Sequence, residues 1–151
     1  MPTKVGLDTS FVIGLMDEQD VWHAPAQALQ TSLDANELQT YIFDCVLAEV
    51  ISALARRTHE KRRRTAFPEL IARLKTRFPT KVVTWLYPDL PANYDAVISL
   101  VEQSAGELNF NDALVAISCR KRGIPFIASF DADFYQVSGL TRIARPEDVP
   151  G

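Results

Sequence analysis

The chain has 151 residues, 47% of them hydrophobic, and a formal net charge of −3. This length and apolar content predict a single globular domain over residues 1–151, and the mild acidity excludes a strongly basic nucleic-acid coat. Because we find no run of about 18 apolar residues and no basic leader before an apolar core, we expect a cytoplasmic protein without a membrane span. Cys45 and Cys119 lack metal-ligand spacing, so they are predicted to be buried, reduced thiols.

Short strand-like runs alternate with longer helical runs along the chain, which indicates βαβ units. Strands are predicted at residues 3–7, 40–43, 81–85, 125–129 and 140–144, and helices at 11–16, 21–34, 45–64, 68–78, 92–104 and 111–122. We therefore expect an α/β fold on a mainly parallel central sheet of about five strands. Asp44 is predicted to cap the helix that follows it, and Gly123 to end the helix before it.

Four acidic residues stand in or beside apolar segments. Asp8 closes the run 5–7 and Asp131 closes the run 125–130, so both are predicted at the carboxyl end of a buried strand, where open α/β sheets bind ligands. Glu49 and Asp112 fall early in two predicted helices, where a buried charge is costly unless it is paired or bound to metal. Four converging carboxylates would suit Mg²⁺ or Mn²⁺.

The two acids at strand ends also have simpler interpretations. Asp8 precedes two hydroxyl residues, Thr9 and Ser10, at a strand-to-helix turn. That turn could hold metal or phosphate oxygen, or Asp8 could be an N-cap only. Asp131 and Asp133 follow one strand, so one of them could bind metal while the other caps a turn.

The two helical acids are ambiguous in the same way. Asp112 begins an apolar stripe on its helix, which places its carboxylate on the core side, but it could equally bond free backbone N–H groups at the helix start. Glu49 could simply pair with Arg56 on the same helix face. The order of the four acids along the chain is more specific than any one of them alone.

The basic residues are concentrated in the segment 56–64, which contains Arg56, Arg57, Lys61, Arg62, Arg63 and Arg64. This basic run could contact the phosphates of RNA, or it could be the solvated end of a helix, where cations favour the helix dipole. Both interpretations stay open. The small acidic turn at Asp17, Glu18 and Asp20 is predicted to be a solvated loop.

Other catalytic classes have weaker support in the sequence. His23 and His59 have no Ser or Cys nucleophile in a recognisable elbow, and there is no phosphate-binding loop. A phosphatase of the haloacid dehalogenase type would need an acid where Ser10 stands. A receiver-like phosphoacceptor domain would need adjacent acids after the first strand and a late lysine.

The four acids lie in segments that resemble the motifs of PIN-domain ribonucleases, and the chain length is similar to that of VapC-type toxins of toxin–antitoxin modules. The matching segments are residues 5–11, 47–50, 111–116 and 129–134. The resemblance implies a PIN-like three-layer α/β/α fold. It also implies an acidic metal-binding pocket formed by Asp8, Glu49, Asp112 and Asp131. Asp133 would be an auxiliary acid of this pocket, and Ser10 and Thr9 would be supporting hydroxyls.

Carried over in full, the resemblance implies an endoribonuclease that depends on Mg²⁺ or Mn²⁺, with RNA as substrate, a cognate antitoxin as partner and a homodimer as its assembly. The sequence departs from the family pattern at Asp44, where a small hydroxyl residue is common, and in the density of the basic run. These departures leave the antitoxin surface and the RNA preference open. Two alternatives also remain: a PIN-like domain that binds RNA or a protein without cutting, and a housekeeping nuclease that is not a toxin.

Overall fold

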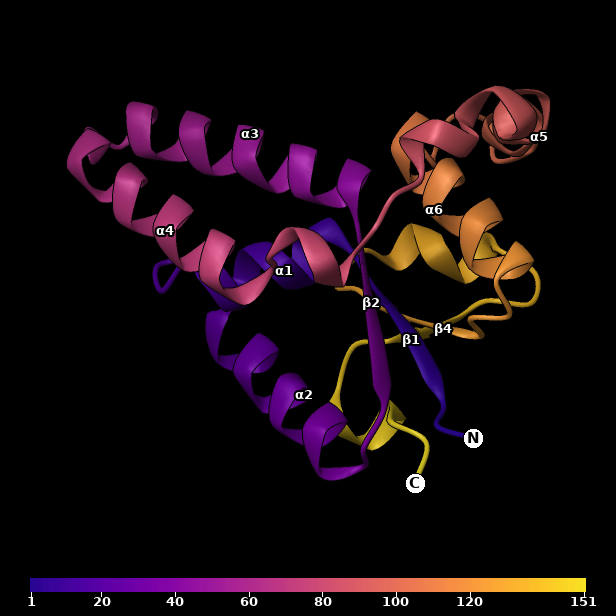
Figure 1. The fold of residues 1–151 in the computed structure, drawn as a ribbon, viewed down its shortest axis with the longest axis horizontal. Coiled ribbons are helices and arrows are strands. Elements are labelled where there is room, and N and C mark those ends of the chain that lie inside the picture. The colour runs from indigo at the N-terminus through magenta and orange to yellow at the C-terminus, as the bar shows by residue number, and fades with distance from the viewer.

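In a computed structural model the chain forms three layers, with a central sheet between two groups of helices (Figure 1). The structure describes the backbone throughout and every side chain except those of residues 135 and 136. The strands are β1 (Lys4–Leu7), β2 (Gln39–Phe43), β3 (Val83–Thr84), β4 (Phe126–Ala128) and β5 (Thr141–Ile143). The helices are α1 (Thr9–Met16), α2 (His23–Ala35), α3 (Asp44–Glu60), α4 (Phe67–Arg77), α5 (Leu90–Gln103) and α6 (Phe110–Lys121). Each predicted strand and helix is thereby confirmed, with shifted ends.

The sheet is parallel throughout and has the strand order β3-β2-β1-β4-β5. The chain moves from β1 outward through β2 to β3, and then crosses back to place β4 on the other side of β1. Leu7 of β1 stands opposite Ala128 of β4, and the backbone N–H of Asp8 donates to the Ala128 carbonyl at 3.0 Å. The turns after β1 and β4 therefore lie side by side at the point where the strand order reverses, which is where such sheets bind ligands.

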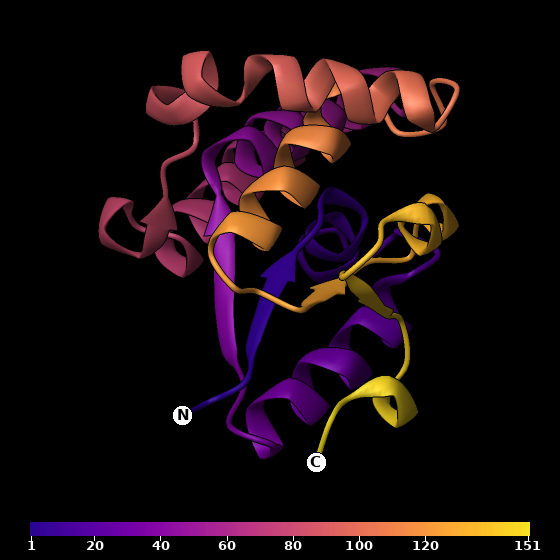
Figure 2. The same cartoon turned by 90° about the vertical axis from the view of Figure 1, so that its right-hand side faces the viewer.

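Helices cover both faces of the sheet. Figure 1 shows α1, α2, α3 and α4 on one side of the strands and α5 and α6 on the other, and the quarter-turn view in Figure 2 keeps α2 and α6 on opposite sides. Gly6 of β1 allows α6 to approach closely, because a Cβ there would lie 3.1 Å from Sγ of Cys119. Cys45 and Cys119 are buried free thiols, as predicted. Within the described part of the chain, the helices lack the length and hydropathy to cross a membrane.

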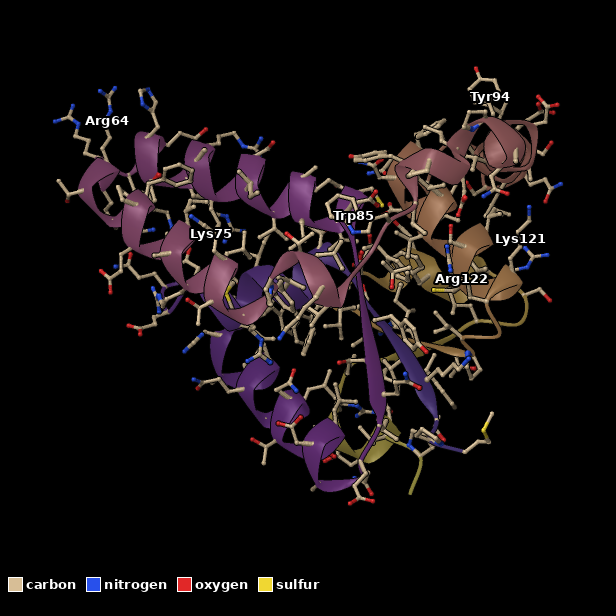
Figure 3. The ribbon with its side chains drawn as sticks, viewed as in Figure 1. Arg64, Lys75, Trp85, Tyr94, Lys121 and Arg122 are labelled. Atoms are coloured by element: carbon tan, nitrogen blue, oxygen red, sulfur yellow. The ribbon has the colours of Figure 1, made fainter. Side chains whose placement is uncertain are left out.

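The basic run does not continue the long helix, contrary to the prediction of a helix over residues 45–64. Helix α3 ends at Glu60, because Arg62 takes the left-handed conformation (φ 54°) and the N–H of Arg63 donates back to the Thr58 carbonyl at 2.7 Å. This is the usual closure of a helix C-terminus, made here without the glycine that would signal it in a sequence. Helices α3 and α4 then lie side by side as a hairpin, and Arg64 points outward from its tip (Figure 3).

Asp44 has a larger structural role than the predicted helix cap. It is the first residue of α3 rather than the residue before it, and its carboxylate accepts the backbone N–H groups of Cys45, Leu86 and Tyr87, each at 2.9 Å. Leu86 and Tyr87 follow β3 in the chain. The buried carboxylate therefore ties the segment after β3 to the start of α3, which is a long-range contact that local capping rules do not reveal.

Candidate active site

A pocket of about 320 Å³ opens where the turns after β1 and β4 meet. Its lining includes all four acids singled out in the sequence, which are Asp8, Glu49, Asp112 and Asp131. They come from four separate parts of the fold: the turn after β1, the middle of α3, the start of α6 and the turn after β4. The hydroxyl residues Thr9 and Ser10 also line this pocket. The fold therefore brings the predicted acids together.

Asp8 is held by hydroxyl groups rather than by the helix it precedes. Its side chain is buried and makes no capping bond to α1, although Asp8 occupies the N-cap position. Its Oδ2 accepts the Ser129 hydroxyl at 2.6 Å and the Ser10 hydroxyl at 3.2 Å. Burial raises the pKa of Asp8 above its usual 3.8, and the Ser129 hydrogen bond opposes that rise. The interpretation of Asp8 as only an N-cap is therefore wrong.

Ser129 is a central residue that sequence reasoning did not single out. Besides donating to Asp8, its Oγ accepts the backbone N–H of Asp131 at 2.9 Å. Ser10 binds the same turn, because its Oγ accepts the N–H of Phe130 at 2.9 Å. These bonds join the turn after β1 to the turn after β4. The available signal was a hydroxyl residue placed directly between a buried strand and a strand-end acid.

Asp112 fulfils both interpretations that its position allowed. It forms a capping box with Asn109: the Asn109 side chain accepts the N–H of Asp112 at 2.8 Å, and Oδ2 of Asp112 accepts the N–H of Asn109 at 3.3 Å. It also lies in the acidic pocket, where burial and then the charge of Asp8 raise its pKa from 3.8 to about 7. Glu49 and Asp131 add to the rise. A cation in the pocket would reverse this effect.

Glu49 is half-buried and faces the same pocket from α3. Burial raises its pKa, the side chain of Asn111 on α6 opposes the rise by hydrogen bonding, and Asp8 adds to it. The ion pairs of the described residues do not join Glu49 to Arg56, so the simple helix pair is not formed. Asn111, at the start of the helix predicted over residues 111–122, is a second residue of the site that sequence reasoning does not single out.

Asp133 lies beside the pocket. Its backbone N–H donates to Oδ1 of Asp131 at 2.9 Å, so Asp131 caps the short 3-10 helix Ala132–Gln136 while its side chain also lines the pocket. The lining formed by the described side chains does not include Asp133. The Asp131 charge raises the pKa of Asp133. An auxiliary role for Asp133 therefore stays a prediction.

Two of the three acids in the turn after α1, Asp17 and Asp20, have covered side chains, contrary to the prediction of a solvated loop, whereas Glu18 is exposed as predicted. Asp17 is almost fully buried, and Asp20 approaches Nη1 of Arg57 to 2.5 Å. Nη1 of Arg57 also lies 3.7 Å from Asp17, and Nη2 of Arg63 lies 3.8 Å from the same carboxylate. Two cations of the basic run thus fold back onto this turn. Arg57 and Asp20 both line the acidic pocket, and Arg56 lines an adjoining hollow of about 450 Å³.

The pocket fits a hydrated divalent cation by its donor chemistry. Three of its carboxyl groups have raised pKa values, because they are buried together with like charges. The Oγ1 of Thr9 is buried there without a hydrogen-bond partner among the described atoms. The described side chains contain no group of three His, Cys, Asp or Glu residues arranged to hold one ion. This is compatible with Mg²⁺, which commonly keeps several waters and takes only one or two carboxylates.

The structure is a parallel α/β/α sandwich with an acidic pocket at the switch point of its sheet. The family model of the PIN domain matches residues 5–140, and the chain belongs to this family. A sequence search of curated proteins gives no match.

Solved structures with the same fold include one described as a toxin and one bound to DNA. VapC20 of Mycobacterium tuberculosis, described as a toxin that cleaves the sarcin–ricin loop, is 27% identical with a TM-score of 0.67, over 89% of this chain and 95% of that one. FitAcB from Neisseria gonorrhoeae is 16% identical with a TM-score of 0.68, over 96% and 99%. VapBC2 from Rickettsia felis, bound to a promoter DNA fragment, is 13% identical with a TM-score of 0.65, over 93% and 98%.

Proposed function

We propose that the protein is a metal-dependent endoribonuclease and the toxin of a toxin–antitoxin pair. The observation that carries the proposal is the convergence of four carboxylates from separate elements on one pocket, in a chain of the PIN domain family. A pocket of this kind repels RNA by itself, and a bound cation would reverse the sign of its potential. The description of VapC20 as a loop-cleaving toxin supports the toxin role.

Asp8, Glu49, Asp112 and Asp131 are the residues that would hold hydrated Mg²⁺ or Mn²⁺, one or two of them directly and the others through water, with Asp133 as an auxiliary acid. When bound, such a metal lowers the pKa of water and neutralises charge on the phosphate that is being cleaved. The protein's own contribution is orientation. The hydroxyls of Ser10 and Ser129 fix the Asp8 carboxylate, the capping box fixes Asp112, and Asn111 holds Glu49. Preorganised ligands of this kind lose little entropy when the substrate arrives.

The basic run would bind the RNA backbone. Its exposed members are Arg56, Lys61, Arg62 and Arg64, whereas Arg57 and Arg63 already contact Asp17 or Asp20. Arg56 lies in the hollow next to the acidic pocket, and Lys61, Arg62 and Arg64 lie in the turn that joins α3 to α4. Figure 3 shows Arg64 at the tip of this hairpin. We infer that Arg56 positions the phosphate near the pocket and that the cations at the hairpin tip attract the strand from a distance.

We also propose a cognate antitoxin, a homodimeric assembly and a cytoplasmic location. The structural similarity to VapBC2 of Rickettsia felis supports the antitoxin partner, since that structure is a complex bound to promoter DNA. We propose the cytoplasmic location because the proposed substrate is RNA. A small gene beside this one, encoding a DNA-binding protein that co-purifies with the chain, would separate a toxin from a housekeeping nuclease.

The test is cleavage of a mixed panel of structured and single-stranded RNAs by the purified protein with Mg²⁺, with Mn²⁺ or with chelator. Asp8→Asn should abolish cleavage because it removes a buried charge from the metal site, while the Ser10 and Ser129 bonds can persist to an amide oxygen. Asp95→Asn is the matched control, because Asp95 is exposed on α5 in the other helix layer. Cleavage that persists in folded Asp8→Asn would contradict the assignment. Binding without cleavage in the parent protein would favour the binding-only alternative.

A further inference from the structure

Trp22 lies at the edge of the acidic pocket and presents an open aromatic surface. Its ring stacks on the ring of Phe130, with centroids 4.6 Å apart and an interplanar angle of 7°. Even so, 45% of Trp22 is exposed, and the residue lines the same pocket as Asp8 and Asp131. A tryptophan that is stacked on one side and open elsewhere leaves apolar surface in water, which commonly marks a binding site.

The ring beneath Trp22 belongs to the catalytic turn itself. Phe130 stands between Ser129, which donates to Asp8, and Asp131, which lines the pocket. The backbone N–H of Phe130 is fixed by the Ser10 hydroxyl, and Phe11 supports its ring with a tilted contact of 6.2 Å between centroids. The aromatic pair is therefore anchored to the two turns that carry the strand-end acids.

The backbone of Trp22 is held on both sides. Its N–H donates to Oδ2 of Asp20 at 3.0 Å, and its carbonyl accepts the N–H of Ala26 at 2.8 Å. Its carbonyl also packs on α1, since a Cβ at Gly14 would lie only 3.0 Å from that oxygen. Asp20 is in turn bound by Arg57, whose guanidinium lines the pocket. The indole thus sits in a fixed position beside both an acidic site and a cation, so little entropy is lost when a ligand stacks on it.

We propose that Trp22, backed by Phe130, is a stacking platform for one nucleobase of the RNA, adjacent to the phosphate that enters the acidic pocket. This inference rests on the proposed ribonuclease function. Each nucleobase has a π-face, so such a platform accepts any base. Its contribution to the free energy of RNA binding comes from a single nucleotide of the strand. The acids and Trp22 on one lining match two parts of a nucleotide substrate, namely the phosphate, which a bound metal would hold, and the base. This shared pocket favours RNA over a protein partner as the occupant.

The experiment measures the binding of single-stranded RNAs of about ten nucleotides, a length in the range of known single-strand sites. The cleavage-inactive Asp8→Asn protein is used with Mg²⁺, and each RNA carries one abasic nucleotide at a different position. Binding should weaken about tenfold when the abasic nucleotide reaches one particular position, which corresponds to the usual worth of a base–aromatic stack. Because this scan needs no change at Trp22, it does not depend on how a variant folds.

Two variants then connect that position to the indole. Trp22→Ala should bind intact RNA about tenfold more weakly than the parent and should lose the sensitivity to the abasic position, while Trp22→Phe should retain most of both. Trp85→Phe is the control, because Trp85 is the second tryptophan, is half exposed and lies after β3, outside this pocket. The same control leaves Trp22 as the sole tryptophan, so quenching of its fluorescence by RNA gives a direct readout of stacking.

The outcomes separate this inference from the proposed function. If the parent cuts RNA but Trp22→Ala binds and cuts it equally well, the platform is overturned and the ribonuclease assignment stands. If Trp22→Ala instead loses only the binding of a co-purified protein, Trp22 belongs to a partner surface and the inference is also overturned. If the parent neither binds nor cuts any RNA of the panel, the proposed function fails and the platform fails with it.

Discussion

Asp112→Asn should make the metal-free protein more stable at about pH 8, although it is expected to destroy activity. Asp112 is surrounded by Asp8, Glu49 and Asp131, and its ionisation is opposed by burial and by these charges. The substitution removes the charge and keeps the shape. An asparagine oxygen can still accept the Asn109 N–H, and the backbone half of the capping box is unchanged.

The size of the effect follows from the pKa of Asp112. A rise from 3.8 to about 7 corresponds to at most about 4 kcal/mol of cost for the ionised form. Because Asp112 is partly exposed, solvent screening reduces this to about 2 kcal/mol. For a chain of this size, that gain would raise the melting temperature by about 4 to 8 °C.

The gain should depend on pH with a defined sign. The folded, metal-free parent binds the Asp112 proton more tightly than the unfolded chain, since the folded pKa is about 7 and the usual value is 3.8. Its stability therefore falls as the pH rises through that window, and the advantage of Asp112→Asn grows over the same range and vanishes near pH 4.

The assay is thermal unfolding followed by circular dichroism in chelator, from about pH 4 to pH 8, for the parent, Asp112→Asn and the exposed control Asp95→Asn. Mg²⁺ should raise the melting temperature of the parent and have much less effect on Asp112→Asn. A melting temperature of Asp112→Asn equal to or below that of the parent at pH 8, without metal, would refute the reasoning about a strained acidic pocket.

Three further predictions concern the neighbouring structure. Ser129→Ala removes the 2.6 Å bond to Asp8, so Mg²⁺ binding measured by calorimetry should weaken about tenfold. Activity should need higher pH, because the pKa of Asp8 rises further without this bond. Unchanged Mg²⁺ affinity would count against the positioning role of Ser129. Gly6→Ala should lower the free energy of unfolding in urea by about 1 kcal/mol, since its Cβ would press on Cys119; an unaltered midpoint would mean that α6 shifts freely. Arg64→Ala should reduce the slope of log binding affinity against log salt concentration by the amount expected for about one phosphate contact, and it should leave the cleavage of bound RNA unchanged. An unaltered slope would exclude the hairpin tip from the RNA site.

The sequence predicts the strands, the helices and the four acids because these signals are local. An acid that directly follows a short apolar run, as at Asp8 and Asp131, indicates that the run is a buried strand and that the strand ends there. In a parallel sheet those ends share one edge, so their proximity follows from the fold class. Gly123 likewise ends α6 by a left-handed conformation that is favourable for glycine (φ 66°).

The errors arise where a distant segment decides the environment of a residue. Asp17 has the polar neighbours of a loop, but Arg57 of α3 and Arg63 of the turn after α3 lie against it. Asp44 binds backbone groups that follow β3, which no capping rule includes. The wrong end of α3 has a local cause instead, because Arg62 takes the left-handed conformation that glycine usually supplies.

The strand order has a consequence for when the pocket can form during synthesis. Asp8 is made well before Ser129 and Asp131, which reach Asp8 only when β4 inserts beside β1. A ribosome-bound chain that has not yet released β4 and the turn after it lacks the Ser129 hydroxyl, which makes the shorter bond to Asp8, and the fourth acid, Asp131. The acidic pocket is therefore incomplete until residues 126–131 have left the ribosome.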